Sequence, residues 1–192
     1  MAKPDQEIIR RVLTGEKKAY VELVNRHKDK AMTLAMRMLK NREDAEEALQ
    51  DAFVRAFHAL PRFEWKASFS TWFYRIVYNV CATALSKNDE SQEVSLQEED
   101  AGRIETPSDE LTPDLQYEST ELRDIVTEEI GKLPEPYASI VTLFFVQEMS
   151  YDEIASVTGF PLGTVKVRLF RARMMLRESI IGRLGWKKEV IA

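Results

Sequence analysis

Residues 150–173 read SYDEIASVTGFPLGTVKVRLFRAR, and the pattern in these letters sets the fold class. Ser150, with Glu153 three residues later, forms a capping box, which predicts the start of a short helix. Gly159 predicts the end of that helix, because glycine adopts the left-handed backbone conformation at a helix C-terminus without strain. A second helix is predicted from about Gly163 to beyond Arg177. Two helices joined by a glycine turn are typical of a helix-turn-helix unit.

The second of these helices is strongly basic. Between Lys166 and Lys188 the chain carries eight basic residues and one acidic residue, Glu178. One face of the helix is apolar and is predicted to pack inward, through Val165, Leu169, Ala172 and Leu176. Arginine and lysine side chains on the other faces can contact guanine edges and phosphates in the major groove of DNA. The charge therefore indicates duplex DNA binding rather than a helical hairpin with a solvated basic face.

Two more helices are predicted just before this unit. An apolar pattern runs from Leu122 to Leu133 and stops at Pro134, which ends a helix. Residues 138–146 are almost continuously apolar, which predicts a buried central helix.

The charge of the chain is unevenly distributed. Residues 89–121 hold 12 acidic residues and one basic residue, a net charge of −11, whereas residues 1–88 carry +5 and residues 122–192 carry +1. The acidic segment is poor in large apolar residues and contains Pro107 and Pro113. We therefore predict an acidic flexible linker that joins two helical domains.

Three helices are predicted in the N-terminal domain. Apolar residues recur there at three- and four-residue steps. Asn41 is predicted to cap the second helix and Pro61 to end it. From charge alone, the outer face of this second helix is a solvated surface. The predicted spans are residues 19–39, 45–60 and 69–85.

The loop over residues 62–69 and the helix after it are rich in aromatic residues. Phe69, Trp72 and Phe73 fit the apolar stripe of the helix and are predicted to lie in the core. Three further rings fall outside that stripe, among several cationic side chains: Trp65, Tyr74 and Tyr78. Exposed rings beside cations suit single-stranded nucleic acid, because bases stack on rings while cations hold phosphates. Core packing is the alternative for these rings.

Four segments in series resemble the extracytoplasmic-function (ECF) sigma factors, which are two-domain members of the bacterial sigma-factor superfamily. The resemblance covers nearly the whole chain, from about Tyr20 to Arg177. The segments read EDAEEALQDAFVRAF (43–57), FSTWFYRIVYNV (69–80), LPEPYASIVTLFFVQEMSYDEIASVTG (133–159) and FPLGTVKVRLFRAR (160–173).

This resemblance implies an all-α transcription initiation factor that performs no chemistry itself and uses no cofactor or metal. The implied partners are core RNA polymerase, promoter DNA (duplex at the −35 element and single-stranded at the −10 element) and an anti-sigma factor. We expect a monomer when the chain is free of partners. The start of the chain does not resemble a signal peptide, and no apolar run approaches about 18 residues, so we expect a bacterial cytoplasmic protein without membrane insertion.

The resemblance also assigns site residues to three surfaces. The second helix would dock on the clamp helices of the polymerase through Asp44, Glu47, Gln50, Asp51, Phe53 and Arg55. The aromatic loop and third helix would open the −10 element through Arg62, Phe63, Trp65, Lys66, Trp72, Tyr74, Arg75, Tyr78 and Asn79. The basic helix would read the −35 element through Thr164, Lys166, Val167, Arg168, Phe170, Arg171 and Arg173.

Two positions depart from the family pattern. After Asn79 the family continues with several basic residues, whereas this chain reads VCATALSKND, with Lys87 as its one cation. Salt-sensitive phosphate contacts there should therefore be few. Val167 stands where serine is common, and valine can make an apolar contact only, as with a thymine methyl group.

Two other classes of function compete with this interpretation. A helix-turn-helix regulator that binds duplex DNA on its own would share the C-terminal block, but it leaves the aromatic loop and the acidic segment unexplained. An enzyme lacks support, because the sequence has no HExxH motif, phosphate loop or nucleophile elbow. His27 and Cys81 are predicted to be buried structural residues. The tail around Trp186 is left without an interpretation.

Overall fold

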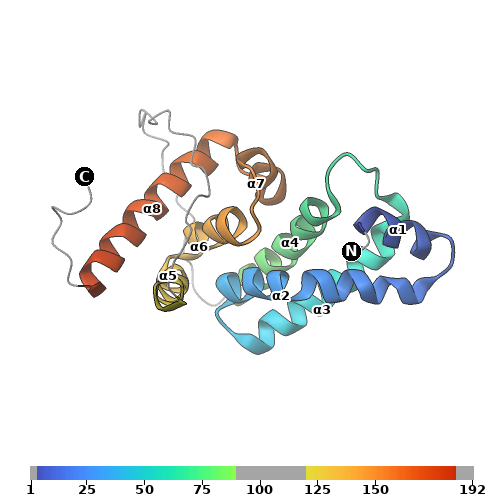
Figure 1. The fold of residues 1–192 in the computed structure, drawn as a ribbon, viewed down its shortest axis with the longest axis horizontal. Helices are drawn as coiled ribbons and strands as arrows, with labels where there is room; N and C mark the ends of the chain where they lie inside the picture. Colours follow the sequence, from blue (N-terminus) through green and yellow to red (C-terminus); the bar gives the residue numbers. More distant parts are fainter. Residues whose placement is uncertain (1–3, 90–119, 185–192) are drawn as a thin grey trace. The chain divides into compact units, whose positions relative to one another are not determined.

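The computed structural model describes residues 4–89 and 120–184 (Figure 1). Every regular element in these two ranges is helical, which confirms the predicted all-α class. The chain forms two compact units, of which the first contains α1–α4 and the second contains α5, α6, most of α7 and α8. Most of the predicted linker and the tail around Trp186 lie outside the described ranges.

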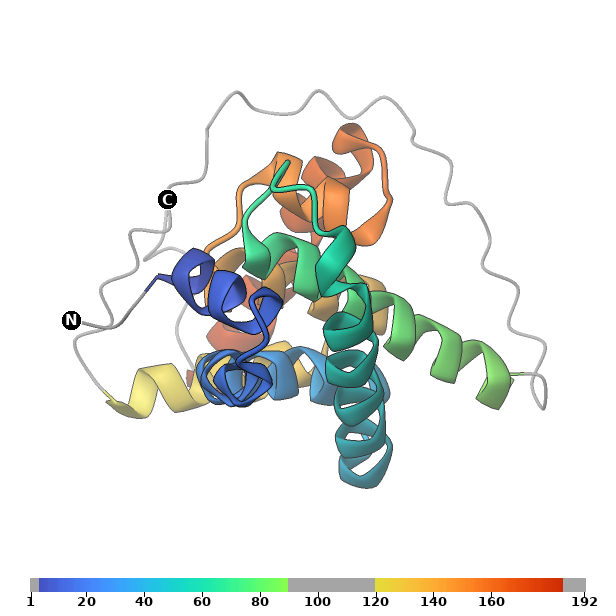
Figure 2. The same cartoon turned by 90° about the vertical axis from the view of Figure 1, so that its right-hand side faces the viewer.

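The first unit is a bundle of three long helices with a short helix packed against it. α2, α3 and α4 pack pairwise on one another, and α1 packs on α2 (Figure 2). None of the helices in the described ranges is long and apolar enough to span a membrane. The elements of this unit are α1 (Asp5–Leu13), η1 (Lys17–Ala19), α2 (Tyr20–Leu39), α3 (Arg42–Ala59), η2 (Leu60–Arg62) and α4 (Phe69–Asp89).

Local signals place the ends of these helices. The Oδ1 atom of Asn41 accepts hydrogen bonds from the backbone N–H groups of Glu43 and Asp44, at 2.8 and 3.3 Å, which confirms the predicted N-cap of α3. Lys40 ends α2 in the left-handed conformation, with φ at 55°. Sequence analysis missed α1, whose N-cap position is Pro4 and offers no side-chain cap.

Aromatic side chains fill the interior of the first unit. Tyr20 is buried and its hydroxyl donates to the backbone carbonyl of Phe53 at 2.8 Å, which joins α2 to α3. Phe53 stacks on Phe73 with ring centroids 4.6 Å apart, which joins α3 to α4. The three long helices thus share one ring-packed core.

The second unit contains α5 (Thr120–Lys132), α6 (Glu135–Val141), the π-helical turn η3 (Thr142–Val146), α7 (Tyr151–Thr158) and α8 (Leu162–Leu184). Pro134 separates α5 from α6, as predicted. All side chains from Tyr137 to Leu143 are buried, which confirms α6 and its continuation as the central element. α6 packs on both α5 and α8.

The helix-turn-helix prediction is confirmed. The Ser150 hydroxyl accepts from the Glu153 N–H at 3.3 Å, and the Glu153 carboxylate accepts from the Ser150 N–H at 3.0 Å, so the capping box closes in both directions. Gly159 ends α7 with φ at 77°. The predicted inward face of α8 is buried, through Val165, Leu169, Ala172 and Leu176.

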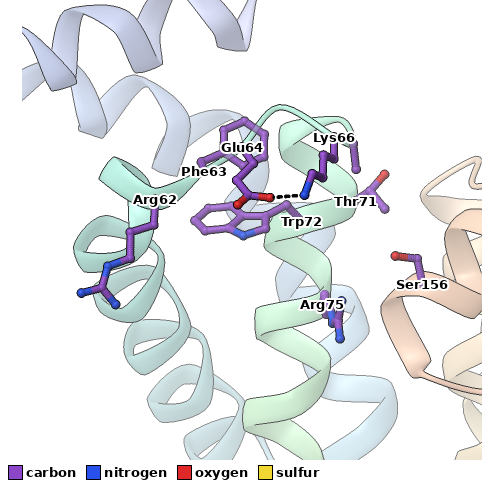
Figure 3. Close-up of a pocket in the computed structure, with 9 residues that line it drawn as sticks. Arg62, Phe63, Glu64, Lys66, Thr71, Trp72, Arg75 and Ser156 are labelled. Carbon is purple, nitrogen blue, oxygen red and sulfur yellow. Dashed lines mark ion pairs between the residues drawn. The ribbon is translucent and has the colours of Figure 1, made fainter.

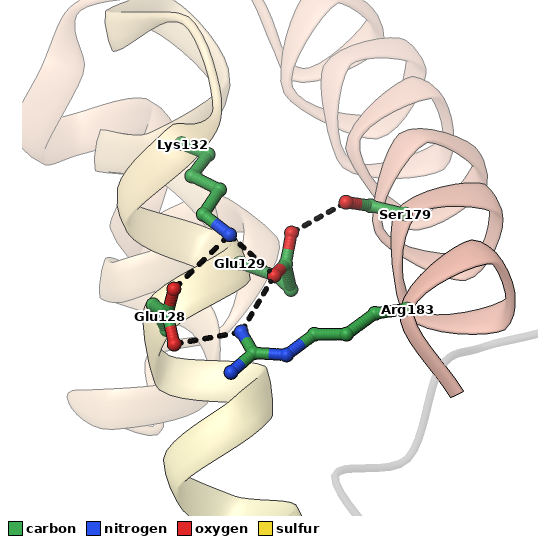
Figure 4. A network of polar contacts seen from close by, with 5 residues as sticks. All are labelled: Glu128, Glu129, Lys132, Ser179 and Arg183. Atoms are coloured by element: carbon green, nitrogen blue, oxygen red, sulfur yellow. Dashed lines mark hydrogen bonds and ion pairs between the residues drawn. The ribbon is translucent and has the colours of Figure 1, made fainter. Parts of the chain in front are cut away.

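An acidic pair on α5 holds the far end of α8 (Figure 4). The Glu129 side chain, only 2% exposed, lies 2.7 Å from the Lys132 ammonium and 2.9 Å from the Arg183 guanidinium, and Ser179 donates to it. Arg183 also lies 2.6 Å from Glu128. These contacts lower the pKa of Glu129 to about 2, with Lys132 contributing most, then Ser179 and Arg183. α8 is therefore anchored to α5 about 20 residues beyond the turn that starts it.

Candidate nucleic-acid interfaces

The predicted −10 residues lie at the end of η2, in the loop that follows it and on α4 (Figure 3). Ser68 starts α4, because its hydroxyl accepts from the Thr71 N–H at 3.0 Å. Phe63 is 8% exposed and anchors the loop. Its ring centroid lies 4.8 Å from that of Trp65 and 5.0 Å from that of Trp72. Packing of the buried Phe63 ring, rather than regular secondary structure, therefore holds the loop in place.

Trp65 combines exposure with backbone strain. Its side chain is 42% exposed, and its φ is 61°, in the left-handed region that bulky residues rarely adopt. Strain of this kind persists only where the surrounding structure holds it, and it concentrates at functional sites. The loop therefore displays a large ring that solvent, or a base, can reach.

Cationic and polar side chains are exposed in the same part of the chain. Arg62 at the end of η2 and Lys66 in the loop are exposed, and Lys66 pairs with Glu64 at 2.6 Å. Arg75 and Asn79 are exposed one helical turn apart on α4. Rings beside cations and an amide can contact both the bases and the phosphates of a single strand.

The prediction that Tyr74 and Tyr78 lie off the core face is wrong. Tyr74 is 2% exposed and Tyr78 is 8% exposed. The reason is that α4 packs on both α2 and α3, so its buried face is wider than one apolar stripe. Burial, with a smaller contribution from the Asp5 carboxylate, raises the pKa of Tyr74. The exposed ring of this region is Trp65, and Trp72, which also packs on Phe63, is half-buried.

The outer face of α3 carries five of the six residues predicted to dock on polymerase. Glu47, Gln50 and Arg55 are exposed, Asp44 and Asp51 are half-buried, and Arg55 pairs with Asp51 at 2.8 Å. The sixth residue, Phe53, faces the core, where it stacks on Phe73.

Sequence reasoning missed an apolar residue on this α3 face. Val54 is 50% exposed and stands directly before Arg55. A valine outside the apolar stripe of α3 is the sequence signal that could have found it. The face therefore offers an apolar contact within a charged surface, a combination typical of protein interfaces.

The candidate −35 residues follow the outer faces of α8. Lys166, Phe170 and Arg173 are exposed, with Phe170 at 37%, whereas Thr164, Val167 and Arg171 are half-buried. Arg168 differs from the others, because its guanidinium lies 4.1 Å above the ring of Phe160 in the turn. A cation over a ring is held by the ring's negative face. Arg168 is thus engaged by the turn that starts its own helix.

The two residues predicted to be structural are buried. His27 is 7% exposed, and its Nε2 atom lies 2.9 Å from the Asp5 carboxylate. Cys81 is fully buried. Among residues 4–89 and 120–184 there is no cluster of His, Cys, Asp and Glu that could hold a metal ion.

Comparison with protein families and curated relatives gives consistent results. The family description Sigma-70 region 2 matches residues 23–91, and Sigma-70, region 4 matches residues 123–176. The chain is 33% identical over 178 residues to the ECF RNA polymerase sigma factor SigW of Bacillus subtilis, covering 90% of this chain and 94% of that one. It is 35% identical over 183 residues to the ECF RNA polymerase sigma-E factor of Escherichia coli, covering 92% and 94%.

Two solved structures share the fold. CnrH in complex with the cytosolic domain of CnrY has a TM-score of 0.62 at 23% identity and covers 93% of this chain and 97% of its own. The sigma factor RpoE of Bartonella quintana, in complex with the anti-sigma factor NepR, has a TM-score of 0.62 at 23% identity and covers 85% and 97%.

Proposed function

The chain belongs to the ECF RNA polymerase sigma factors, and from this membership we propose how its two helical units divide promoter recognition. It is a transcription initiation factor that directs RNA polymerase to promoters. Its curated relatives are regulatory proteins. We propose that this chain does no chemistry itself, leaves nucleotidyl transfer to the polymerase and acts in the bacterial cytoplasm, where that polymerase transcribes.

We propose a different role for each of three segments of the chain. Residues 1–88 bind polymerase and open the −10 element, residues 89–121 link the domains, and residues 122–192 read the −35 element. The partners are core RNA polymerase, promoter DNA and an anti-sigma factor. The related RpoE structure, which contains such an inhibitor, supports the last of these.

The −10 function is carried by one observation, the exposed and strained Trp65, which directly precedes the exposed Lys66 in the chain. Opening a duplex requires a base to leave its stack, at a cost of a few kcal/mol. A ring fixed in advance can offset that cost, since base–aromatic stacking contributes about 1–3 kcal/mol. Arg62, Lys66 and Arg75 then hold phosphates of the displaced strand, and Asn79 can hydrogen-bond a base edge.

The −35 function belongs to α8. A helix in the major groove reads bases through side chains near its N-terminus. Lys166 and Arg171 supply cations for base edges or phosphates, and Val167 offers an apolar contact to a thymine methyl group.

The outer face of α3 is proposed to dock on polymerase. Its charged residues steer the encounter, and Val54 supplies apolar area that becomes buried on docking. The residues of this face are Asp44, Glu47, Gln50, Asp51, Val54 and Arg55.

The division of labour can be tested with two sets of variants of the full chain. Trp65→Ala and Asn79→Ala should slow opening of a duplex promoter at least tenfold and spare a pre-melted template, because a melted strand needs no unstacking. Tyr74→Phe is the matched control, since it keeps a buried ring and should open promoters normally. Equal loss on duplex and pre-melted templates would contradict the proposed −10 role.

Charge reversal tests the other unit. Lys166→Glu with Arg171→Glu should abolish −35-dependent binding and leave association with core polymerase intact. Lys17→Glu with Lys18→Glu changes the net charge equally at exposed residues outside the proposed surfaces, and it should leave both activities intact. Loss of polymerase association in the α8 variant would contradict the assignment. Tight, sequence-specific duplex binding by the chain alone would favour a stand-alone regulator.

A further inference from the structure

The N-terminal helix α1 is tied to the bundle by one carboxylate. Asp5 lies at the start of α1, and its Oδ2 atom is 2.9 Å from Nε2 of His27 on α2. The same carboxylate pairs with Arg26. Apolar burial supports the attachment, because Ile8 and Ile9 are fully buried. The region 2 match begins at residue 23, so α1 lies outside it.

The His27 ring connects the Asp5 carboxylate to aromatic rings of α4. It lies edge-on to the ring of Phe69, with centroids 5.2 Å apart, and 6.1 Å from the ring of Phe73. Phe69 is the first residue of α4 and therefore stands at the end of the loop. A histidine ring held on one side by a carboxylate can fix the phenylalanine that it contacts on the other side.

From Phe69 the contacts continue to the exposed tryptophan. The Phe69 and Phe63 rings are perpendicular, with centroids 6.2 Å apart. The Phe63 ring lies 4.8 Å from that of Trp65. A series of direct contacts thus runs from Asp5 through His27, Phe69 and Phe63 to Trp65. A second route exists, because α1 also contacts η2, which leads directly into the loop.

We propose that Asp5 and His27 are positioning residues for −10 recognition, acting through Phe69 and Phe63 to hold Trp65 in its left-handed conformation. The physical reason is that a bulky residue with positive φ returns to a relaxed conformation unless its neighbours prevent it. α1 therefore belongs to the promoter-opening apparatus without touching DNA. The proposal rests on the −10 role of the loop given above.

The variants separate the positioning effect from simple destabilisation. Asp5→Ala removes the carboxylate, whereas Asp5→Asn keeps an oxygen that can accept from a neutral histidine. His27→Gln keeps a donor for Asp5 but removes the ring that touches Phe69. Arg26→Gln is the matched control, since it removes the ion pair between Arg26 and Asp5 and keeps the contact of Asp5 with His27. Met38→Ala is a second control, because it destabilises the core at the opposite end of α2.

Two measurements are made on the full chain. The first is the rate of promoter opening by holoenzyme, on duplex and on pre-melted templates. The second is fluorine NMR of the free protein labelled with 5-fluorotryptophan, in which the Trp65 resonance is assigned from Trp65→Phe. The second measurement needs no polymerase, so it reports on positioning even if the −10 role were wrong.

Asp5→Ala and His27→Gln should shift or broaden the Trp65 resonance and slow duplex opening by roughly tenfold, with little effect on pre-melted DNA. Asp5→Asn should recover most of the rate, and Arg26→Gln and Met38→Ala should leave the Trp65 resonance unchanged. An unmoved Trp65 resonance in Asp5→Ala and His27→Gln would overturn the proposal, as would a moved resonance with normal opening. Failure of wild-type holoenzyme to open any promoter would instead overturn the proposed function.

Discussion

Trp65 has a strained backbone conformation, which we connect with its proposed function. Its φ of 61° crowds Cβ against the backbone, a conflict that glycine does not have. Left-handed backbone costs a non-glycine residue on the order of 1–2 kcal/mol. The fold keeps this unfavourable backbone conformation at the residue whose exposed ring is proposed to stack on a base.

A pair of substitutions separates strain from function at this position. Trp65→Gly should unfold at higher denaturant than Trp65→Ala, by about 1 kcal/mol in free energy, because only alanine keeps the conflict. Both should open duplex promoters at least tenfold more slowly than the wild-type chain, because both lack the ring. Urea titration and opening assays give the two readouts. A glycine variant that opens promoters normally would show that the ring is dispensable.

Glu129 gives the second unit a pH dependence. Its pKa is lowered from 4.5 to about 2, mainly by Lys132, so its ionised form stabilises the folded state. This contribution is complete above pH 4.5 and is lost as the pH falls from 4.5 toward 2. Glu129→Gln should therefore melt at a lower temperature near neutrality and show a flatter decline over that window.

Glu128→Gln is the matched comparison for this prediction. The Glu128 carboxylate is half exposed, and its removal leaves the contacts of Glu129 with Lys132 and Ser179 in place. Its thermal melting curves, followed by circular dichroism, should keep most of the decline with falling pH. An unchanged pH profile in Glu129→Gln would show that the carboxylate adds no net stability in its ionised form.

At the scale of the element, α8 is held at both ends. Near its start Arg168 lies over Phe160, and near its end Arg183 and Ser179 contact the acidic pair on α5. At 1.5 Å per residue the helix is about 34 Å long. Rigid attachment of this kind fixes the angle at which a recognition helix meets DNA.

Arg168 is therefore expected to position α8 rather than to read a base. Arg168→Lys keeps the positive charge but loses the flat group that stacks on Phe160. Binding to −35 DNA should weaken several-fold and evenly across sequences, and Phe160→Leu should weaken it in the same way. Binding to a library of −35 sequences measures both effects. A changed preference at one base position would show that Arg168 reads that base directly.

Prediction of elements from sequence succeeded where a local signal was strong. Asn41, Ser150 with Glu153, and Gly159 each act within a few residues, and all three placed a helix boundary correctly. α1 was missed because it is short and depends on burial of Ile8 and Ile9 by the bundle. That burial comes from tertiary packing, which periodicity in a short segment does not reveal.

Tertiary packing also limited how much of the candidate site could be predicted from the sequence. The two tyrosines of α4 were assigned to the surface because one apolar stripe was assumed, whereas two neighbouring helices bury them. The pairing of Glu129 with Arg183 spans 54 residues and leaves no local pattern. The left-handed Trp65 is equally invisible in sequence, since tryptophan does not favour that conformation.

At the scale of the whole molecule, the segments of the chain that differ in net charge also differ in proposed function. The N-terminal and C-terminal blocks carry +5 and +1, and the segment between them carries −11. Surfaces proposed to contact DNA lie on α4 with its preceding loop and on α8. The surface proposed to contact polymerase lies on α3. One chain thereby offers separate surfaces for the enzyme that it directs and for two promoter elements.

The central claim is tested most directly by transcription in vitro with core polymerase, a fragmented genomic template library and sequencing of the RNA 5′ ends. The wild-type chain should produce new starts that share two upstream elements at a fixed spacing. Lys166→Glu with Arg171→Glu should lose the starts that depend on the distal element. The absence of any new start, with the chain alone binding duplex DNA tightly, would contradict the account.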